Sequence, residues 1–199
     1  RVERLVNTIQ LDLRFQTELQ TIRYSLRERA TNAQTSQLAT TWDTLVENHV
    51  EGLAAVIRGN ISDPNRLFRL VEQLPSEKIQ AFIGQMVPGV SREFMRVVIR
   101  ILGAHSRYLQ GTAAERDLRT LLYGHLVRYA IDAPNRGKNT RSLTNYFFRV
   151  LQATPWVNRD LIVDWVETIG ELPPEFTGVI ERVRERERGG EGESETEGE

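Results

Sequence analysis

Residues 91–108, SREFMRVVIRILGAHSRY, combine an apolar face with a cationic one. At 3.6 residues per helical turn, five apolar side chains share one face: Phe94, Val97, Val98, Ile101 and Leu102. Arginines recur on the opposite face at Arg92, Arg96 and Arg100, and Arg107 lies on the same predicted helix; we call these four residues the arginine ridge. Ser91 is a favourable N-cap, and Glu93 stands in the first turn, where the helix dipole favours a negative charge. The pattern predicts a helix that buries one face and presents the ridge.

The same helical period runs through most of the chain. It predicts helices over 3–29 and 36–58, two short helices after the capping pairs at 63–64 and 75–76, and further helices over 112–132, 142–154, from 158 and over 175–188. No convincing strand alternation is present. We therefore expect an all-α fold, a compact single-domain bundle of about eight helices over residues 1–188.

Two details of this pattern predict local features. The apolar stripe of residues 3–29 slips between Leu13 and Phe15, which indicates a bend or a change of packing partner there. Residues 36–58 carry a heptad-like stripe that predicts one continuous helix: Leu38, Trp42, Leu45, His49, Leu53 and Val56. The three tryptophans, Trp42, Trp156 and Trp165, are expected to be core or interface anchors.

Composition excludes several classes of protein. The chain has 199 residues, 40% of them hydrophobic, but no apolar run approaches the roughly 18 to 20 residues that a membrane span needs. It has no cysteine, which excludes disulfides, thiolate metal sites and cysteine nucleophiles. No secretory signal peptide is evident. We expect no association with membranes.

The net charge of −1 conceals a strong asymmetry. Residues 92–149 carry eleven basic and four acidic side chains, whereas residues 160–199 carry four basic and thirteen acidic ones. The last eleven residues, GGEGESETEGE at 189–199, are expected to be a disordered acidic tail. Only two of the 26 basic residues are lysine, and arginine suits bidentate pairing with phosphate or carboxylate.

The sequence gives no indication of catalysis. His49, His105 and His125 lie on different predicted helices without metal-ligand spacing, and neither a phosphate-binding glycine motif nor a G-x-S-x-G motif is present. No acidic residues form a recognisable catalytic pair. We therefore expect no catalytic, metal-binding or cofactor-binding residues and no enzyme activity.

The basic middle region is the one group of residues in the sequence that suggests a binding site. Its candidate polyanion- or partner-binding residues are Arg92, Arg96, Arg100 and Arg107 on the predicted helix and Arg136, Lys138 and Arg141 in a predicted loop at 133–141. Such a surface can follow a phosphate backbone without reading bases. It can equally meet an acidic partner or the acidic tail of another copy, and solvated helix faces are the plain structural alternative.

The order of several stretches resembles the family of adenovirus 52/55-kilodalton packaging proteins. The stretches are LV at 5–6 with FQ at 15–16, LATTWDTLV at 38–46, NRLFRLVEQ at 65–73, AFIGQMVPGVSREFMRVVIRIL at 81–102, LLYGHLVRYA at 121–130 and YFFRVLQATPWVNRDLI at 146–162, followed by the acidic tail. They are mostly hydrophobic anchors, and the likeness covers most of residues 5–185. The chain lacks the long N-terminal region of that family, and its helix before Phe15 is a few residues shorter.

The resemblance implies a non-enzymatic factor for viral genome packaging and scaffolding. It implies partners that include the viral packaging ATPase, a penton-associated minor capsid protein and viral DNA, together with self-association into a homo-oligomer. It also implies the nucleus of the infected host cell and immature particles, with absence from the mature virion. The alternative is a generic α-helical interaction module whose acidic tail masks its basic surface, without DNA contact.

Overall fold

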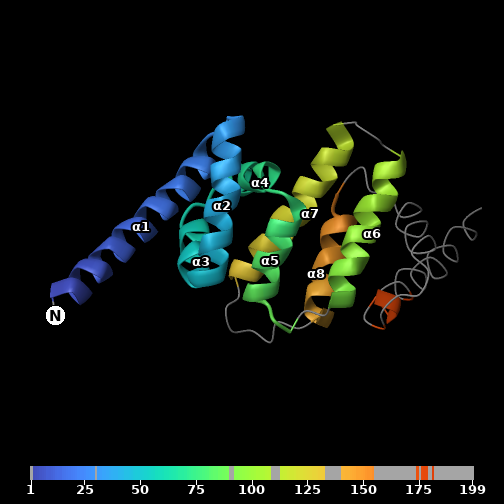
Figure 1. Cartoon of the computed structure of the whole chain (residues 1–199). Coiled ribbons are helices and arrows are strands. Elements are labelled where there is room, and N and C mark those ends of the chain that lie inside the picture. The colour runs from blue at the N-terminus through green and yellow to red at the C-terminus, as the bar shows by residue number, and fades with distance from the viewer. Residues whose placement is uncertain are drawn as a thin grey trace, which may run out of the picture. The chain divides into compact units, whose positions relative to one another are not determined.

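The computed structural model describes residues 2–29, 31–89, 92–108, 113–132, 140–154, 174, 176–178 and 181 (Figure 1). These ranges hold no strand, and their helices are α1 (Val2–Arg27), α2 (Asn32–Asn48), α3 (Val50–Arg58), α4 (Pro64–Gln73), α5 (Ser76–Met86), α6 (Arg92–Tyr108), α7 (Ala113–Asp132) and α8 (Thr140–Gln152). The all-α prediction is confirmed. No helix in the described part of the chain is both long enough and apolar enough to cross a bilayer.

The chain forms two compact units. The first comprises residues 1–88 and 116–136, and the second comprises residues 89–115 and 137–199. The first therefore holds α1 to α5 and most of α7, whereas the second holds α6 and α8. The single domain expected over residues 1–188 stays a prediction, and the acidic tail lies outside the described residues.

The core of the first unit is built from the apolar faces of its helices. In this unit α1 packs on α2, α3 and α4, and α2 also packs on α3 and α5. Trp42 is 1% exposed, lies 5.3 Å from the Phe82 ring and donates its indole N–H to the Lys78 carbonyl at 2.9 Å. The expected anchor role of Trp42 is confirmed, because its ring is buried and its one polar atom is paired. Trp156 and Trp165 lie outside the described residues.

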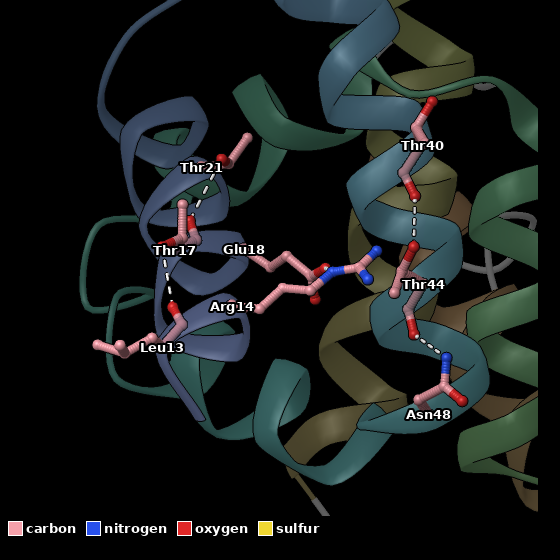
Figure 2. Close-up of polar contacts among 8 residues, drawn as sticks. All are labelled: Leu13, Arg14, Thr17, Glu18, Thr21, Thr40, Thr44 and Asn48. Carbon is pink, nitrogen blue, oxygen red and sulfur yellow. Dashed lines mark hydrogen bonds and ion pairs between the residues drawn. The ribbon is translucent and has the colours of Figure 1, made fainter. Parts of the chain in front are cut away.

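The slip in the apolar stripe of α1 coincides with a change in packing. The helix continues through it without interruption, so no bend forms (Figure 1). Leu13 is 63% exposed and points away from α2 (Figure 2), whereas Phe15 lies 4.5 Å from the His49 ring. An added Cβ at Gly52 would lie 2.7 Å from the Phe15 ring, so glycine permits this close approach of α1 to α3. Of the two alternatives, the bend is not observed, and a change of packing partner stays a prediction, because most side chains before Leu13 are not described.

The single helix expected over residues 36–58 is wrong, because the structure divides it at His49. There φ is −145° and ψ is 38°, which lie outside the helical range. The His49 N–H still donates to the Leu45 carbonyl, and its own carbonyl accepts from Leu53, so the apolar stripe continues across the break. The Phe15 ring lies against His49 and Gly52 at this point, and the heptad pattern contains no sign of that contact from another helix.

Several polar side chains on α1 and α2 form hydrogen bonds or ion pairs within their own helices (Figure 2). The hydroxyls of Thr17 and Thr44 donate to carbonyls four residues earlier, and Arg14 pairs with Glu18 at 3.1 Å. Every bond drawn in Figure 2 therefore stays inside one helix. Such bonds satisfy polar groups without linking α1 to α2, so the packing of these helices depends on their apolar side chains.

Several arginines of the first unit donate hydrogen bonds to backbone carbonyls at the C-terminal ends of neighbouring helices. Arg58 donates from Nε and Nη2 to the Ile131 carbonyl near the end of α7, at 3.1 and 2.6 Å. Arg69 donates to the Arg27 carbonyl at the end of α1. The last carbonyls of a helix lack partners within it, and a guanidinium supplies several donors in a fixed fork. Part of the arginine excess is therefore structural.

Arg119 on α7 makes the most extensive of these contacts. Its guanidinium donates to the Val71 and Leu74 carbonyls at the end of α4 and to Ser76 Oγ at 2.9 Å, and it lies 5.7 Å from the Tyr123 ring centre. Burial lowers the pKa of Arg119 from its ordinary value. The contacts hold α7 against the turn between α4 and α5.

The second unit is centred on aromatic side chains. Phe94 of α6 lies 5.8 Å from Phe147 of α8 and 5.4 Å from Phe176, and Phe148 lies 5.7 Å from Phe176. All four rings are buried. The described residues between 174 and 181 are helical, in agreement with part of the helix expected over 175–188. This cluster joins α6, α8 and the residues around Phe176.

Candidate polyanion-binding surface

The apolar face of α6 is buried as the sequence predicts. Four residues of this face are at most 3% exposed: Phe94, Val97, Val98 and Ile101. The side chain of Leu102 is not among the described ones. Because this face is fixed by the aromatic cluster, the opposite face of α6 is held toward solvent.

Three residues of the arginine ridge lie on that opposite face. Arg92, Arg96 and Arg100 are all exposed. With a rise of 1.5 Å per residue, their positions recur about every 6 Å along the helix, or about 12 Å from first to last. Arg107 lies in α6, but its side chain is outside the described ones. The sequence prediction of two opposed faces is confirmed for the residues that the structure describes.

Arg92 and Arg96 differ from many arginines of the first unit in having no ion-pair partner among the described side chains. No carboxylate of the described residues forms an ion pair with either guanidinium. Arg14 and Arg29, by contrast, pair with Glu18 and Glu72 at 3.1 Å. Unneutralised, exposed guanidinium groups at helical spacing can accept an anion without first breaking an internal contact.

Sequence reasoning did not include Ile99 in the site. Its side chain is 45% exposed, which is unusual for isoleucine beside a buried apolar face. It follows Arg92 by seven residues and Arg96 by three, so it shares the exposed face of α6 with them. The sequence alone indicates that Ile99 is exposed, because the 3.6-residue period places position 99 outside the apolar face.

Arg141 lies in a helix and not in the predicted loop. The loop expected over residues 133–141 is wrong at its end, since α8 begins at Thr140. No glycine or proline occurs between residues 138 and 152, so nothing in the backbone delays the helix. Arg141 and Arg149 are both exposed, and α8 contains no acidic residue. Arg136 and Lys138 lie outside the described residues.

The cationic character of the second unit therefore extends over two helices. Phe94 and Phe147 bring α6 and α8 together in this unit. The structure thus places Arg141 on a helix that packs against the one carrying the ridge. It adds Arg149, which sequence reasoning did not single out, although it lies eight residues, or about two helical turns, after the exposed Arg141.

Other titratable side chains in the first unit are occupied in packing. His125 lies 5.7 Å from the Phe68 ring, and burial, with a smaller effect of Arg128, lowers its pKa below 6.5. Tyr123 Oη accepts from Gln80 Nε2 at 2.7 Å, and burial raises the pKa of this phenol. Within the described ranges, no three histidine, aspartate or glutamate side chains gather as a metal site. The ridge remains the candidate functional surface.

No protein-family model matches this chain, and no significant match exists among the curated proteins or the solved structures that were compared with it. The arginine ridge and the sequence resemblance are therefore the features of this chain that bear on its function. The fold and surface define an all-α protein with an exposed cationic helix face.

Proposed function

We propose that this chain is a non-enzymatic assembly protein that holds other molecules, with the arginine ridge as its contact for a polyanion. The observation that supports this proposal most strongly is the exposure of Arg92 and Arg96 without a carboxylate partner among the described residues. A helix anchored by buried phenylalanines presents these charges as a fixed row. Because the helix fixes the backbone positions of these arginines, only their flexible side chains have to become ordered when an anion binds.

The surface suits phosphate better than base edges. Guanidinium groups bind phosphate oxygens with two parallel hydrogen bonds, and a row of them can follow a nucleic-acid backbone. Such contacts position a protein on DNA without reading its sequence. The expected binding is therefore non-specific and strongly dependent on salt.

The sequence resemblance gives this binding a biological setting. It supports a role in packaging and scaffolding a viral genome during virion assembly in the host nucleus. Under this proposal the partners are viral DNA, the packaging ATPase, a penton-associated minor capsid protein and further copies of the chain. The chain would then act in immature particles and be absent from the mature virion.

Ile99 favours a second candidate, a protein-interaction module without DNA contact. An exposed isoleucine among arginines provides apolar area that a phosphate backbone does not use. A partner helix with acidic and apolar residues would contact both. Replacement Ile99→Ser separates the two candidates, because DNA affinity should change less than about twofold while binding to a protein partner falls.

The test measures DNA affinity against salt concentration. For the full chain, log Kd should depend linearly on log salt, with a slope of roughly 0.9 per phosphate contacted. The triple variant Arg92→Ala, Arg96→Ala, Arg100→Ala should lower that slope by about 2 to 3. A matched control, Arg14→Ala, Arg29→Ala, Arg128→Ala, removes the same charge from exposed positions in the first unit. Equal slopes for the two variants would exclude the ridge as the DNA contact.

A further inference from the structure

We propose that the arginine ridge has an occupant within the same molecule, the acidic tail. This inference rests on the proposed function of the ridge and names its regulation. The tail carries five glutamates at strictly alternating positions, 191, 193, 195, 197 and 199, and no basic residue. Charge alone would allow many acidic segments to bind the ridge. The alternating glutamates of the tail match the ridge in spacing as well as in charge.

The spacing of the two rows of charge is similar. In an extended chain, alternate side chains lie on one side and recur about every 6.6 Å. Ridge positions recur about every 6 Å along α6. Three successive pairs would therefore drift by only about 1.2 Å, which flexible arginine side chains can absorb. In a helix, residues two apart lie on nearly opposite sides, so the same glutamates could not face one ridge together.

The chain itself tethers the tail near α6. Phe176 lies 5.4 Å from Phe94, which stands between Arg92 and Arg96 in the sequence of α6. From Phe176 to the first glutamate of the tail there are 15 residues, which reach at most about 50 Å when extended. The diameter of a helix with its side chains is about 10 to 12 Å, so the tail can reach the far side of α6. Tethering of this kind gives an effective concentration in the millimolar range.

The structure leaves room for such an occupant. Arg92 and Arg96 have no carboxylate partner among the described residues. Individual exposed ion pairs are weak, so the contact would be reversible and sensitive to salt. A polyanion with higher charge density would displace the tail. The tail would thereby restrict the ridge to strongly anionic partners.

Crosslinking tests the contact directly, because the natural chain has no cysteine. The variant Ile99→Cys, Ser194→Cys should give a monomeric crosslink with a short bismaleimide at low salt. The control variant Leu13→Cys, Ser194→Cys uses a more exposed position on α1, outside the second unit. We expect at least a fivefold higher yield for the first pair, and loss of this excess at about 1 M salt. Equal yields, or crosslinked dimers alone, would overturn the proposal.

Two tail variants test the role of charge and of alternation. Replacing all five glutamates with glutamine should abolish the excess crosslinking. A tail of unchanged composition, with its five glutamates made consecutive, should reduce the excess about threefold or more. An unchanged yield in the first variant would refute the charge contact, and an unchanged yield in the second would refute the match of spacing.

DNA binding separates this inference from the proposed function. If both hold, the all-glutamine tail should raise DNA affinity about tenfold at low salt, and it should do so only when the ridge is intact. If the ridge does not bind DNA, the crosslinking result still decides whether the tail occupies it. If crosslinking shows no preference while the ridge variant lowers the salt slope, the tail contact fails and the proposed function stands.

Discussion

Gly124→Ala should destabilise the protein, although alanine is usually the better helix residue. Gly124 lies inside α7 and is buried against Phe68 of α4. A Cβ added at this position would lie 2.4 Å from Cδ1 and 2.5 Å from Cε1 of the Phe68 ring. Atoms of this size do not approach so closely, so the ring or one of the helices must move. Gly84 in α5 is the matched control, since an added Cβ there meets nothing within 4 Å.

The two substitutions should change stability in opposite directions. At either position, alanine gains about 1 kcal/mol over glycine through helix propensity. At Gly124, crowding of a packed contact costs about 3 kcal/mol, near the upper end of the range for overpacking. The free energy of unfolding should therefore fall by about 2 kcal/mol for Gly124→Ala and rise by about 1 kcal/mol for Gly84→Ala. For a chain of this size, Tm should shift by about 2 to 4 °C per kcal/mol.

Urea unfolding provides the assay, followed by far-ultraviolet circular dichroism and by tryptophan fluorescence. Trp42 lies in the core of the same unit and contributes to the fluorescence signal together with Trp156 and Trp165. The double variant Gly124→Ala, Phe68→Leu should recover part of the loss, because the shorter side chain makes room for the methyl group. If Gly124→Ala stabilises the protein as much as Gly84→Ala does, the close contact of α7 with α4 is refuted.

Three further predictions concern the first unit. Arg119→Met should lower the free energy of unfolding by about 2 to 3 kcal/mol, because it removes the guanidinium donors to the Leu74 carbonyl and to Ser76 Oγ. Arg119→Lys should recover only part of this loss. A full recovery by lysine in thermal unfolding would contradict the forked contact. Burial lowers the pKa of His125 in the folded protein below the unfolded value of 6.5, so the free energy of unfolding should decrease as the pH falls from about 6.5 toward the lower folded pKa. His125→Gln should flatten this pH dependence in urea titrations at a series of pH values. An unchanged profile would exclude His125 as its source. Ile22→Ala should lower the free energy of unfolding by about 2 to 4 kcal/mol, because this side chain is fully buried. Leu13→Ala should lower it by less than about 0.5 kcal/mol, because Leu13 is exposed. Equal losses in urea unfolding would contradict the packing of α1.

Much of the candidate surface could be predicted from periodicity. The spacing of Arg92, Arg96 and Arg100 against Phe94, Val97, Val98 and Ile101 requires only that residues 92–108 form a helix with one buried face. The exposure of Ile99 follows from the same period. The pairing state of each arginine could not be predicted, because it depends on which carbonyls and carboxylates other helices bring nearby.

Arginine composition illustrates this limit. The sequence shows 24 arginines without indicating which are structural. The fold assigns Arg58, Arg69 and Arg119 to the ends of neighbouring helices, through contacts that span 42 to 73 positions in the chain. It leaves Arg92 and Arg96 without a carboxylate partner among the described residues. Composition therefore indicates a binding surface only after these structural arginines are identified.

The amino-acid sequence by itself determined the helices and their buried faces, because hydrophobic period, capping residues and the positions of proline and glycine act over a few neighbouring residues. Two of these predictions fail because tertiary structure decides the outcome: the helix breaks at His49, where Phe15 approaches from another helix, and α8 begins at Thr140. Tertiary structure also decides the division of the chain into two units. Contacts between residues distant in the chain depend on the shape and volume of several helices at once, and a local pattern does not contain that information.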